Sequence, residues 1–460
     1  MDPSPPMDGH VVVVPYPGRG HINPLMHLCN LLLSKNSNIL FTFVITQEWH
    51  GFIGSDPKPD NIRLKTIPNV IPSERGRGND IVGFLDAVMT RMEAPFEQLL
   101  DRLHPPPTFI IHDTYLFWVV GVGNRRNIPV ASFFPMSASF FSVLYHYRLF
   151  EQNGHYPANL SENGDERVDY IPGLPPTRLA DFPLNDGSWQ SRKILRWIVK
   201  AFQWVLKAQY LLFPSILELE SQAIHALKAD FPIPIYTIGP AIPHLSLKHN
   251  PSSCITDQND PSYMKWLDTQ PSGSVLYVSQ GSFLSASTAQ LEEIVAGLRA
   301  SEVRFLWIAR GENLKLRETC GNMGLVCSWC DQLRVLSHPA IGGFWSHCGW
   351  NSTREGAFAG VPFLAFPLIM DQPMNCKLIV EDWKTGWRVK KGVKEGVLVT
   401  GDEVAGILKT FMDLSSDEGR ELRKRAKQVQ QICRLAIADG GSSETNVNTF
   451  LRDLLQCGKP

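Results

Sequence analysis

The sequence predicts an α/β protein with two domains, the first built on a doubly wound parallel sheet. Two apolar segments rich in β-branched residues, 10–14 and 39–45, flank a helical pattern and form a β-loop-α-β unit. Between about 242 and 261 the chain turns polar and rich in Pro, Ser and Asn, which is typical of a linker. A second alternation of strands and helices follows, and 460 residues suffice for two domains of ordinary size.

The first strand is predicted at 10–14, and the loop 15–21 follows it. Asn23 suits a helix N-cap and Pro24 a first helical residue, so the first helix is predicted to begin there. Ligands of a doubly wound sheet bind at the carboxyl ends of its strands, which places His21 on a ligand-facing loop. The loop lacks the GxGxxG pattern of a dinucleotide-binding turn.

Another central strand is predicted at 109–111, and it ends in His112 and Asp113. If the strands are parallel, Asp113 lies at the same edge of the sheet as His21. Two segments rich in aromatic residues and Leu are predicted to be core helices that could also line an apolar pocket. These segments are 137–150 and 192–213. The elements predicted after the linker are strands at 274–279 and 305–309 and helices at 287–300, 418–438 and 446–455.

The stretch 329–372 combines a predicted strand, a glycine turn and a helix start with polar side chains. A buried strand is predicted at 341–346, followed by a tight turn in which Gly349 supplies conformational freedom. Ser352 and Glu355 have the spacing of a capping box, so a helix is predicted to start there. A strand, a glycine turn and a helix N-terminus together suit a phosphate. Side-chain donors are added by His347, Asn351 and Ser352.

The two ends of this stretch suit the other parts of a nucleotide sugar. Trp329 offers a flat face for a base, and Gln332 lies a short step away. At the other end, Asp371 and Gln372 pair a carboxylate with an amide, which suits a polyol such as a sugar.

Structural alternatives remain open for several of these residues. Strand–glycine–helix junctions are common in α/β proteins, and most bind nothing. Glu355 could be only a capping residue, Trp350 could belong to the core, and 371–372 could be a solvated turn. A lone histidine in a loop is more often a surface residue than a general base. His112 is a second candidate for the role of the base.

Composition narrows the range of partners. The formal net charge is −1, so the chain has no basic excess for nucleic acid or an anionic membrane, and a small ligand is expected. Nine scattered cysteines suit free thiols in a reducing compartment. The N-terminus has no signal-peptide pattern, and no run reaches about 18 apolar residues. We therefore expect a cytoplasmic protein without a membrane span.

The stretch 329–372 resembles the signature box of plant UDP-glycosyltransferases, the family 1 glycosyltransferases. The matching positions are Trp329, Gln332, His338, Gly342, His347-Cys348-Gly349-Trp350-Asn351-Ser352, Glu355, Gly360-Val361-Pro362, Pro367 and Asp371-Gln372. Asp331 departs from the family, which usually has Pro there, and Gln280 stands where Phe is commoner. Further resemblances at 17–24, 171–174, 236–240, 266–268, 281–282 and 440–443 extend the match over nearly the whole chain.

The resemblance implies the GT-B fold, in which two Rossmann-like doubly wound domains face each other across a cleft. The implied first domain, 1–245, binds the acceptor, and a C-terminal helix at 446–460 packs back onto it. A linker at 246–262 leads to the domain 263–445, which binds the UDP-sugar.

The resemblance also implies roles for individual residues. His21 is implied to be the general base and Asp113 its partner. The implied donor contacts are uracil stacking by Trp329, ribose contacts by Gln332 and Glu355, phosphate contacts by Ser282, His347, Asn351 and Ser352, and sugar contacts by Trp350, Asp371 and Gln372. A Gln at position 372 resembles members that use UDP-glucose.

The implied activity is inverting transfer of glucose from UDP-glucose to a hydroxyl of a small lipophilic acceptor, such as a phenolic, flavonoid or terpenoid. A monomer without a cofactor is expected. The alternative is a non-catalytic nucleotide-sugar-binding sensor or partner protein; an NAD-dependent dehydrogenase has little support without a GxGxxG motif. Cys327 and Cys330 have the CxxC spacing of a zinc site, but no second close pair follows, so no metal is expected.

Overall fold

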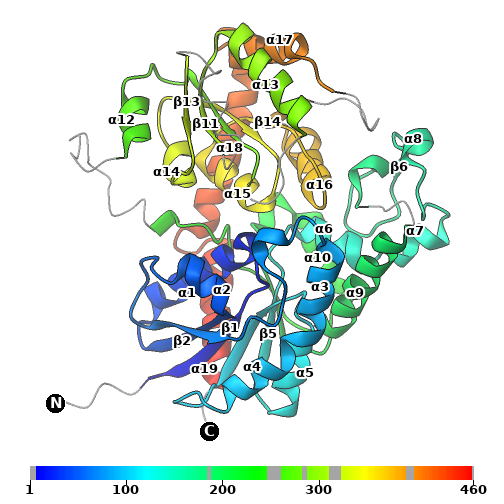
Figure 1. Ribbon diagram of the computed structural model, residues 1–460, viewed down its shortest axis with the longest axis vertical. Helices are drawn as coiled ribbons and strands as arrows, with labels where there is room; N and C mark the ends of the chain where they lie inside the picture. Colours follow the sequence, from blue (N-terminus) through cyan, green and yellow to red (C-terminus); the bar gives the residue numbers. More distant parts are fainter. Residues whose placement is uncertain are drawn as a thin grey trace.

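Two parallel β-sheets form the framework of the molecule (Figure 1). The computed structural model describes residues 7–183, 188–245, 261–281, 287–309, 323–389 and 398–457. Within these residues, the first sheet has the strand order β3-β2-β1-β4-β5-β8-β9 and the second the order β12-β11-β10-β13-β14-β15. Both orders reverse direction beside the first strand of the sheet, and such a switch point is where doubly wound sheets bind ligands. The predicted GT-B architecture of two α/β units is therefore present.

The central strands of the first sheet are buried almost throughout, as parallel strands covered by helices are. Its strands are β1 (Gly9–Val14), β2 (Ile39–Thr46), β3 (Ile62–Ile67), β4 (Phe109–Asp113), β5 (Val130–Phe133), β8 (Tyr210–Phe213) and β9 (Ile235–Thr237). The helices of this half are α1 (Arg19–Lys35), α2 (Gln47–Ile53), α3 (Ile81–Arg91), α4 (Glu93–Leu100), α5 (Trp118–Arg125), α6 (Ala138–Tyr145), α7 (Arg148–Gln152), α8 (Leu160–Asn163), α9 (Trp189–Val205) and α10 (Ser221–Asp230). A small hairpin, β6 (Arg167–Val168) with β7 (Thr177–Arg178), lies beside them, with 3₁₀ turns at Leu179–Asp181 and Leu217–Leu219.

The second sheet is smaller and is built on the same plan. Its strands are β10 (Val275–Ser279), β11 (Arg304–Ile308), β12 (Gly324–Cys327), β13 (Ile341–Ser346), β14 (Phe363–Ala365) and β15 (Gly386–Arg388). Its helices are α12 (Ser262–Asp268), α13 (Thr288–Ser301), α14 (Gln332–Leu336), α15 (Trp350–Ala359), α16 (Gln372–Lys377), which continues into a π-helix at Leu378–Asp382, α17 (Gly401–Met412) and α18 (Asp417–Ile437). Apolar clusters fill both faces of this sheet.

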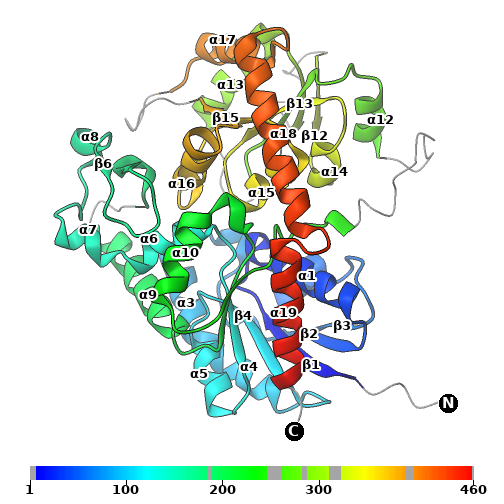
Figure 2. The same ribbon diagram turned by 180° about the vertical axis from the view of Figure 1, so that it is seen from behind.

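The last helix, α19 (Ser442–Cys457), lies on the first sheet although the preceding α18 belongs to the second half (Figure 2). Its apolar face joins the cluster formed by β1, β2 and α1, through Val447, Phe450, Leu451 and Leu454. Polar contacts fasten the same helix, because Asn446 donates to Thr237 O at 3.1 Å and Tyr236 donates to Asp453 at 2.6 Å. The predicted linker, 246–262, lies outside the described residues apart from its last two positions.

Several helix boundaries differ from those predicted. The first helix begins at Arg19, not at Asn23, and Pro24 is inside it. The helix tolerates Pro24 because the carbonyl that loses its helical donor, Gly20 O, accepts from the side chain of Asn351 at 3.1 Å. The segment 192–213 is a helix only as far as Val205 and then forms β8. The last helix begins at Ser442, four residues earlier than predicted.

Hydrogen bonds and ion pairs join the two halves. Trp350 Nε1 donates to Pro214 O at 3.2 Å, and Trp383 Nε1 donates to Leu219 O at 3.1 Å. Two ion pairs cross the same junction: Arg388 with Asp181 at 2.8 Å, and Arg167 with Glu381 at 3.0 Å.

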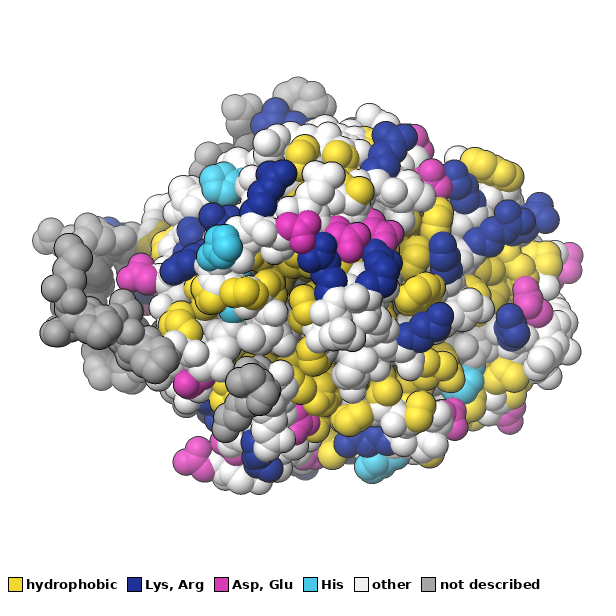
Figure 3. All heavy atoms as spheres, turned by 90° about the horizontal axis from the view of Figure 1, so that it is seen from below, with side chains coloured by type: hydrophobic (Ala, Val, Ile, Leu, Met, Phe, Trp, Pro, Cys, Tyr) yellow, Lys and Arg dark blue, Asp and Glu magenta, His cyan; other side chains and the backbone are white. Residues whose placement is uncertain are grey.

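In the view of Figure 3, from below, acidic and basic side chains are mixed with hydrophobic ones over the surface of the first half.

Candidate active site

His21 and Asp113 form a hydrogen-bonded pair at the carboxyl edge of the first sheet. His21 lies in the first turn of α1, and Asp113 is the last residue of β4. The Nδ1 atom of His21 and the Oδ2 atom of Asp113 are 2.7 Å apart, and the Asp113 side chain is wholly buried. The other carboxylate oxygen accepts from the backbone of Tyr115 at 3.1 Å. The carboxylate is therefore held at both oxygens, and the imidazole keeps its Nε2 atom for another partner.

His112, the competing histidine, is placed differently. Successive side chains of a strand point to opposite faces of the sheet, so His112 and Asp113 diverge. Both ring nitrogens of His112 are buried. Burial lowers the pKa of His112 to about 4, so the ring is neutral near pH 7. Asp113 thus pairs with His21 and not with its neighbour.

Aromatic rings surround His21. The ring centroid of Tyr16 lies 4.8 Å from that of His21, and the centroid of Tyr115 lies 6.1 Å away. Phe84 follows behind Tyr16 at 6.4 Å. Burial raises the pKa of both tyrosines well above its usual value, so their hydroxyl groups stay protonated. The imidazole therefore sits at the rim of a largely apolar, aromatic environment.

The turn between β13 and α15 faces this pair from the second half. The prediction that Gly349 provides the unusual backbone conformation is wrong, because Gly349 has a φ of −61° and Cys348 has a φ of 64°. Glycine is needed at 349 for space: a Cβ atom there would lie 2.4 Å from Nε2 of His347. Gly281 approaches the same ring, and its Cβ would lie 2.6 Å from that nitrogen.

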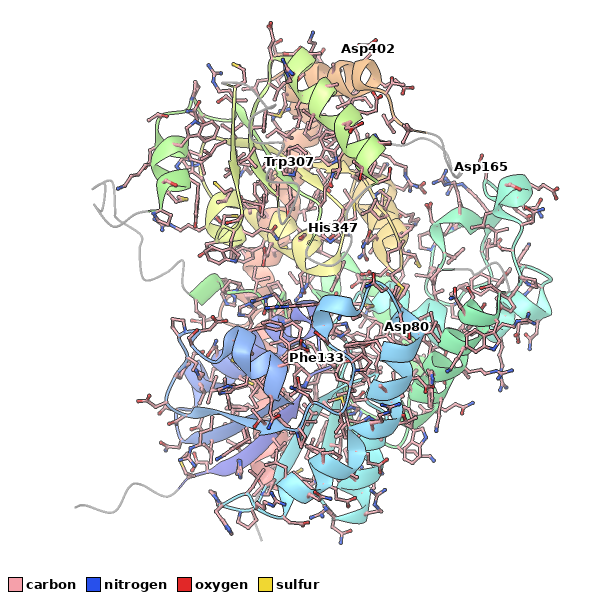
Figure 4. All side chains as sticks on the ribbon, viewed as in Figure 1. Asp80, Phe133, Asp165, Trp307, His347 and Asp402 are labelled. Atoms are coloured by element: carbon pink, nitrogen blue, oxygen red, sulfur yellow. The ribbon has the colours of Figure 1, made fainter. Side chains whose placement is uncertain are left out.

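His347 is enclosed between these two glycines. Burial lowers its pKa to about 4, so the imidazole is neutral near pH 7. Its Nδ1 atom is buried and lacks a hydrogen-bond partner within the described residues. Figure 4 labels His347 in the second half, on the side that faces the first.

The predicted capping box at the start of α15 is wrong. The helix begins at Trp350 with Gly349 as its N-cap, and no side chain caps it. Ser352 and Glu355 therefore lie inside the helix and turn toward Gln332, whose amide nitrogen donates to Ser352 Oγ at 3.0 Å and to Glu355 Oε2 at 2.7 Å. Without a capping side chain, the first N–H groups of α15 are left for another acceptor.

Gln332, Ser352 and Glu355 form one polar cluster beside β10. Tyr277 donates to the amide oxygen of Gln332 at 3.1 Å, so all three groups have a defined orientation. Burial raises the pKa of Glu355 to about 7, with the Gln332 hydrogen bond opposing the shift. The cluster presents carboxylate and hydroxyl oxygens that can accept hydrogen bonds from sugar hydroxyls.

Among the predicted donor residues that the structure describes, Trp329 is the most exposed, at 62%. It lies in the loop between β12 and α14. Asp331, which stands where the family usually has Pro, is the N-cap of α14 and accepts from Arg334 N at 3.1 Å. Its own N–H donates to the Tyr263 hydroxyl at 3.1 Å, a bond that Pro could not make. Asp331 therefore holds the loop through its hydrogen bonds with Tyr263 and Arg334.

Asp371 and Gln372 start α16, and the solvated-turn alternative does not hold for Asp371, which is buried. Asn375 donates to its Oδ2 atom at 2.7 Å. Burial raises the pKa of Asp371 to about 6, and the nearby His21 is among the groups that oppose this shift. The Gln372 side-chain oxygen accepts from Leu368 N at 2.8 Å, which leaves its amide nitrogen toward other partners.

Trp350 and Asn351 connect the two halves in different ways. The indole of Trp350 is 5% exposed and donates across the junction, so its ring belongs to the core. Asn351 lies one residue further along α15 and donates to Gly20 O, next to His21. The start of α15 therefore faces the start of α1. Ser282 lies outside the described residues.

Known proteins resemble this chain over most of its length. Residues 240–412 match the family model described as UDP-glucoronosyl and UDP-glucosyl transferase. The chain is 52% identical to UDP-glycosyltransferase 87A1 of Arabidopsis thaliana, over 96% of this chain and 99% of the relative. It is also 52% identical to UDP-glycosyltransferase 87A2 of the same plant, over 99% of both chains.

This protein is a member of the UDP-glycosyltransferase family.

Solved structures of other members share its architecture. The structure of Medicago truncatula UGT71G1 complexed with UDP-glucose covers 97% of this chain with a TM-score of 0.79 and 27% identity. Phytolacca americana UGT2, complexed with UDP-2fluoro-glucose and pterostilbene, matches over 97% of this chain with a TM-score of 0.79 and 26% identity. The UDP-glycosyltransferase described here is therefore an enzyme that transfers a sugar from a UDP-sugar.

Sequence reasoning missed several residues of this UDP-glycosyltransferase site. Asn375 lies four residues after Asp371, and this helical spacing could have suggested the contact. Tyr277 was hidden in an apolar strand, where no pattern separates it from a core residue. Arg354 gave no signal at all, because a charged residue in a helix is usually solvated.

Between residues 7 and 457, leaving out the gaps already given, no group of three or more His, Cys, Asp and Glu side chains could hold a metal ion. In the same described ranges, no helix is both long and apolar enough to cross a bilayer. His338, which belongs to the CxxC neighbourhood in sequence, instead contacts Asp268 at 3.1 Å.

Proposed function

We propose that this UDP-glycosyltransferase transfers glucose from UDP-glucose to a hydroxyl of a small lipophilic acceptor, with inversion at the anomeric carbon. His21 is the general base and Asp113 its partner. The observation that carries the proposal is the 2.7 Å hydrogen bond between these residues, located opposite the uncapped start of α15. One half thus supplies a base, and the other supplies a place for the leaving diphosphate.

The base removes the proton of the acceptor hydroxyl. Asp113 accepts a hydrogen bond from Nδ1 of His21, which fixes the tautomer with Nε2 unprotonated. Nε2 then takes the proton as the acceptor oxygen attacks the anomeric carbon, and the buried carboxylate stabilises the imidazolium that forms. General base catalysis of this kind contributes about 10²–10⁴-fold to the rate.

The leaving diphosphate is neutralised without a metal in this proposal. The first N–H groups of α15 and the positive end of its dipole face the anion. Asn351 and Ser352 donate from their side chains, and the neutral His347 donates through an N–H. Ser282 is the remaining candidate for this role.

The other donor contacts follow the polar clusters of the second half. Trp329 stacks on uracil, while Gln332 and Glu355 bind the ribose hydroxyls. Asp371 and Gln372 bind the sugar, together with the backbone of Trp350, since the indole is turned into the core. The UDP-glucose complex of Medicago truncatula UGT71G1 supports glucose as the donor sugar.

The acceptor is proposed to be a phenolic, flavonoid or terpenoid alcohol. The aromatic rings of Tyr16, Tyr115 and Phe84 around His21 favour a flat or greasy molecule. A relative that is 32% identical to the chain, 7-deoxyloganetin glucosyltransferase of Catharanthus roseus, is named for the glucosylation of a small molecule, which supports a small acceptor.

The test is UDP release by the purified protein with UDP-glucose, EDTA and a panel of phenolic and terpenoid alcohols. We expect release that depends on the acceptor class and persists in EDTA, and a β-glucoside as the product. His21→Ala should abolish transfer while leaving the dissociation constant for UDP within about twofold. An α-glucoside, or loss of UDP affinity in His21→Ala, would contradict the proposed mechanism.

A further inference from the structure

Arg354 is a buried cation at the junction of the two halves. It lies in α15, and 5% of the residue is exposed. Its hydrogen-bond partners within the described residues are carbonyl and amide oxygens: those of Pro240, Ala241 and Asn351. Burial lowers the pKa of Arg354 to about 9, which leaves the guanidinium charged near neutral pH. A buried charge is unfavourable unless it is paired or hydrogen-bonded, so the contacts of Arg354 matter.

One of these contacts holds the side-chain amide of Asn351. One terminal nitrogen of Arg354 donates to Asn351 Oδ1, and Asn351 Nδ2 donates to Gly20 O at 3.1 Å. A flipped amide would place its NH₂ group against the guanidinium, so two donors would face each other. The amide therefore keeps its oxygen toward Arg354 and its NH₂ group toward Gly20, beside His21.

The backbone has an unusual feature at each end of this series of hydrogen bonds. Pro24 has no N–H, so Gly20 O lacks its usual helical donor and is open to Asn351. At the other end, Arg354 contacts the segment in which the chain leaves the first half, where Ala241 has a φ of 42°. The hydrogen bonds thus connect residues 240–241 with Arg354, Arg354 with Asn351, and Asn351 with Gly20, which precedes His21.

We propose that Arg354 is a positioning residue for the donor: it orients Asn351 so that one amide N–H is fixed on Gly20 and the other is presented to the diphosphate of the UDP-sugar. The orientation depends on contact between the two halves, so the diphosphate site is complete only when they are together. This inference rests on the proposed role of Asn351 in binding the diphosphate.

A calorimetric double-mutant cycle with UDP as the probe tests the proposal. We expect Arg354→Met to raise the dissociation constant for UDP about tenfold or more, because a hydrogen bond to a charged group is lost. Asn351→Ala should have a similar effect. The double variant should bind no worse than Asn351→Ala alone, because Arg354 acts through that amide.

Arg354→Lys separates positioning from stability. Lysine keeps the charge and can reach the carbonyls at 240–241, but it lacks the fork that also reaches Asn351. We expect it to recover the melting temperature lost in Arg354→Met without recovering UDP affinity. If Arg354→Met fails to fold, this variant decides the question by itself.

Arg388→Met is the matched control, because Arg388 also crosses the junction but contacts Asp181 and not Asn351. It should lower the melting temperature and leave the dissociation constant within about twofold. Wild-type affinity in Arg354→Met or Arg354→Lys, or multiplying effects in the double variant, would overturn the inference. Failure of the wild-type protein to bind UDP would instead overturn the proposed function on which it rests.

Discussion

At the scale of single residues, Glu355 makes the stability of the enzyme depend on pH. Burial raises its pKa from 4.5 to about 7, which corresponds to roughly 3 kcal/mol at ~1.4 kcal/mol per unit. Because the folded state holds the proton more tightly than the unfolded state, this contribution is present below pH 4.5. It is lost as the pH rises through about 7.

Glu355→Gln should remove that dependence, since an amide cannot ionise and its oxygen can still accept from Gln332. We expect the variant to match the wild type in free energy of unfolding at pH 4.5 and to exceed it at pH 8. Urea denaturation at the two pH values measures the difference. A variant that is equally less stable at both would show that Glu355 is not held protonated by burial.

Sequence reasoning reached some residues and not others for physical reasons. His21 and Asp113 were expected at one sheet edge because parallel strands end together, and the structure pairs them. The reason why position 349 needs a glycine was missed. That reason is the close approach of the His347 ring, and the approach exists only in the folded protein. The sign of φ at Cys348 was missed because a cysteine carries no mark of a left-handed conformation.

At the scale of elements, the junction between β13 and α15 depends on space around His347. Gly349→Ala would place a Cβ atom 2.4 Å from Nε2 of that ring, so either the imidazole or the turn must shift. We expect the free energy of unfolding to fall by about 1–3 kcal/mol and UDP affinity to fall with it. Chemical denaturation and calorimetry measure the two effects.

Gly406→Ala is the control for this substitution. Gly406 lies in α17, and nothing is found within 4 Å of the position that its Cβ would take. It should raise the free energy of unfolding by about 0.5–1 kcal/mol, as expected for a helical glycine in open space. Equal effects of the two substitutions would mean that His347 is not confined by Gly349.

Element boundaries show where local signals were overridden. Asn23 and Pro24 predicted a helix start, but α1 begins earlier, at Arg19. The longer helix is possible because Asn351 of the other half donates to Gly20 O, the carbonyl that Pro24 leaves without a helical donor. Ser352 and Glu355 had the spacing of a capping box but turned toward Gln332. In both cases a partner distant in sequence decided the outcome. Strands such as 341–346 were predicted within a residue because their apolar runs are buried on both faces.

At the scale of the whole molecule, α19 ties the end of the chain to its beginning. Phe450 is completely buried, and its ring lies 6.0 Å from that of Phe109 and 5.9 Å from that of Tyr210. Phe450→Ala should lower the free energy of unfolding of the first half by about 3–5 kcal/mol. Leu435→Ala, at a position that is 61% exposed, should change it by no more than about 0.5 kcal/mol. A change below 1 kcal/mol in Phe450→Ala would show that α19 adds little to that core.

The return of α19 also has a consequence for how the protein is made. A ribosome makes β1 and α1 well before α19, at about 5–20 residues per second. During all of the time between, the nascent first domain has an apolar face with no helix over it. A ribosome that stalls within the second domain would therefore hold a first domain whose apolar face is still uncovered, and such a face promotes aggregation.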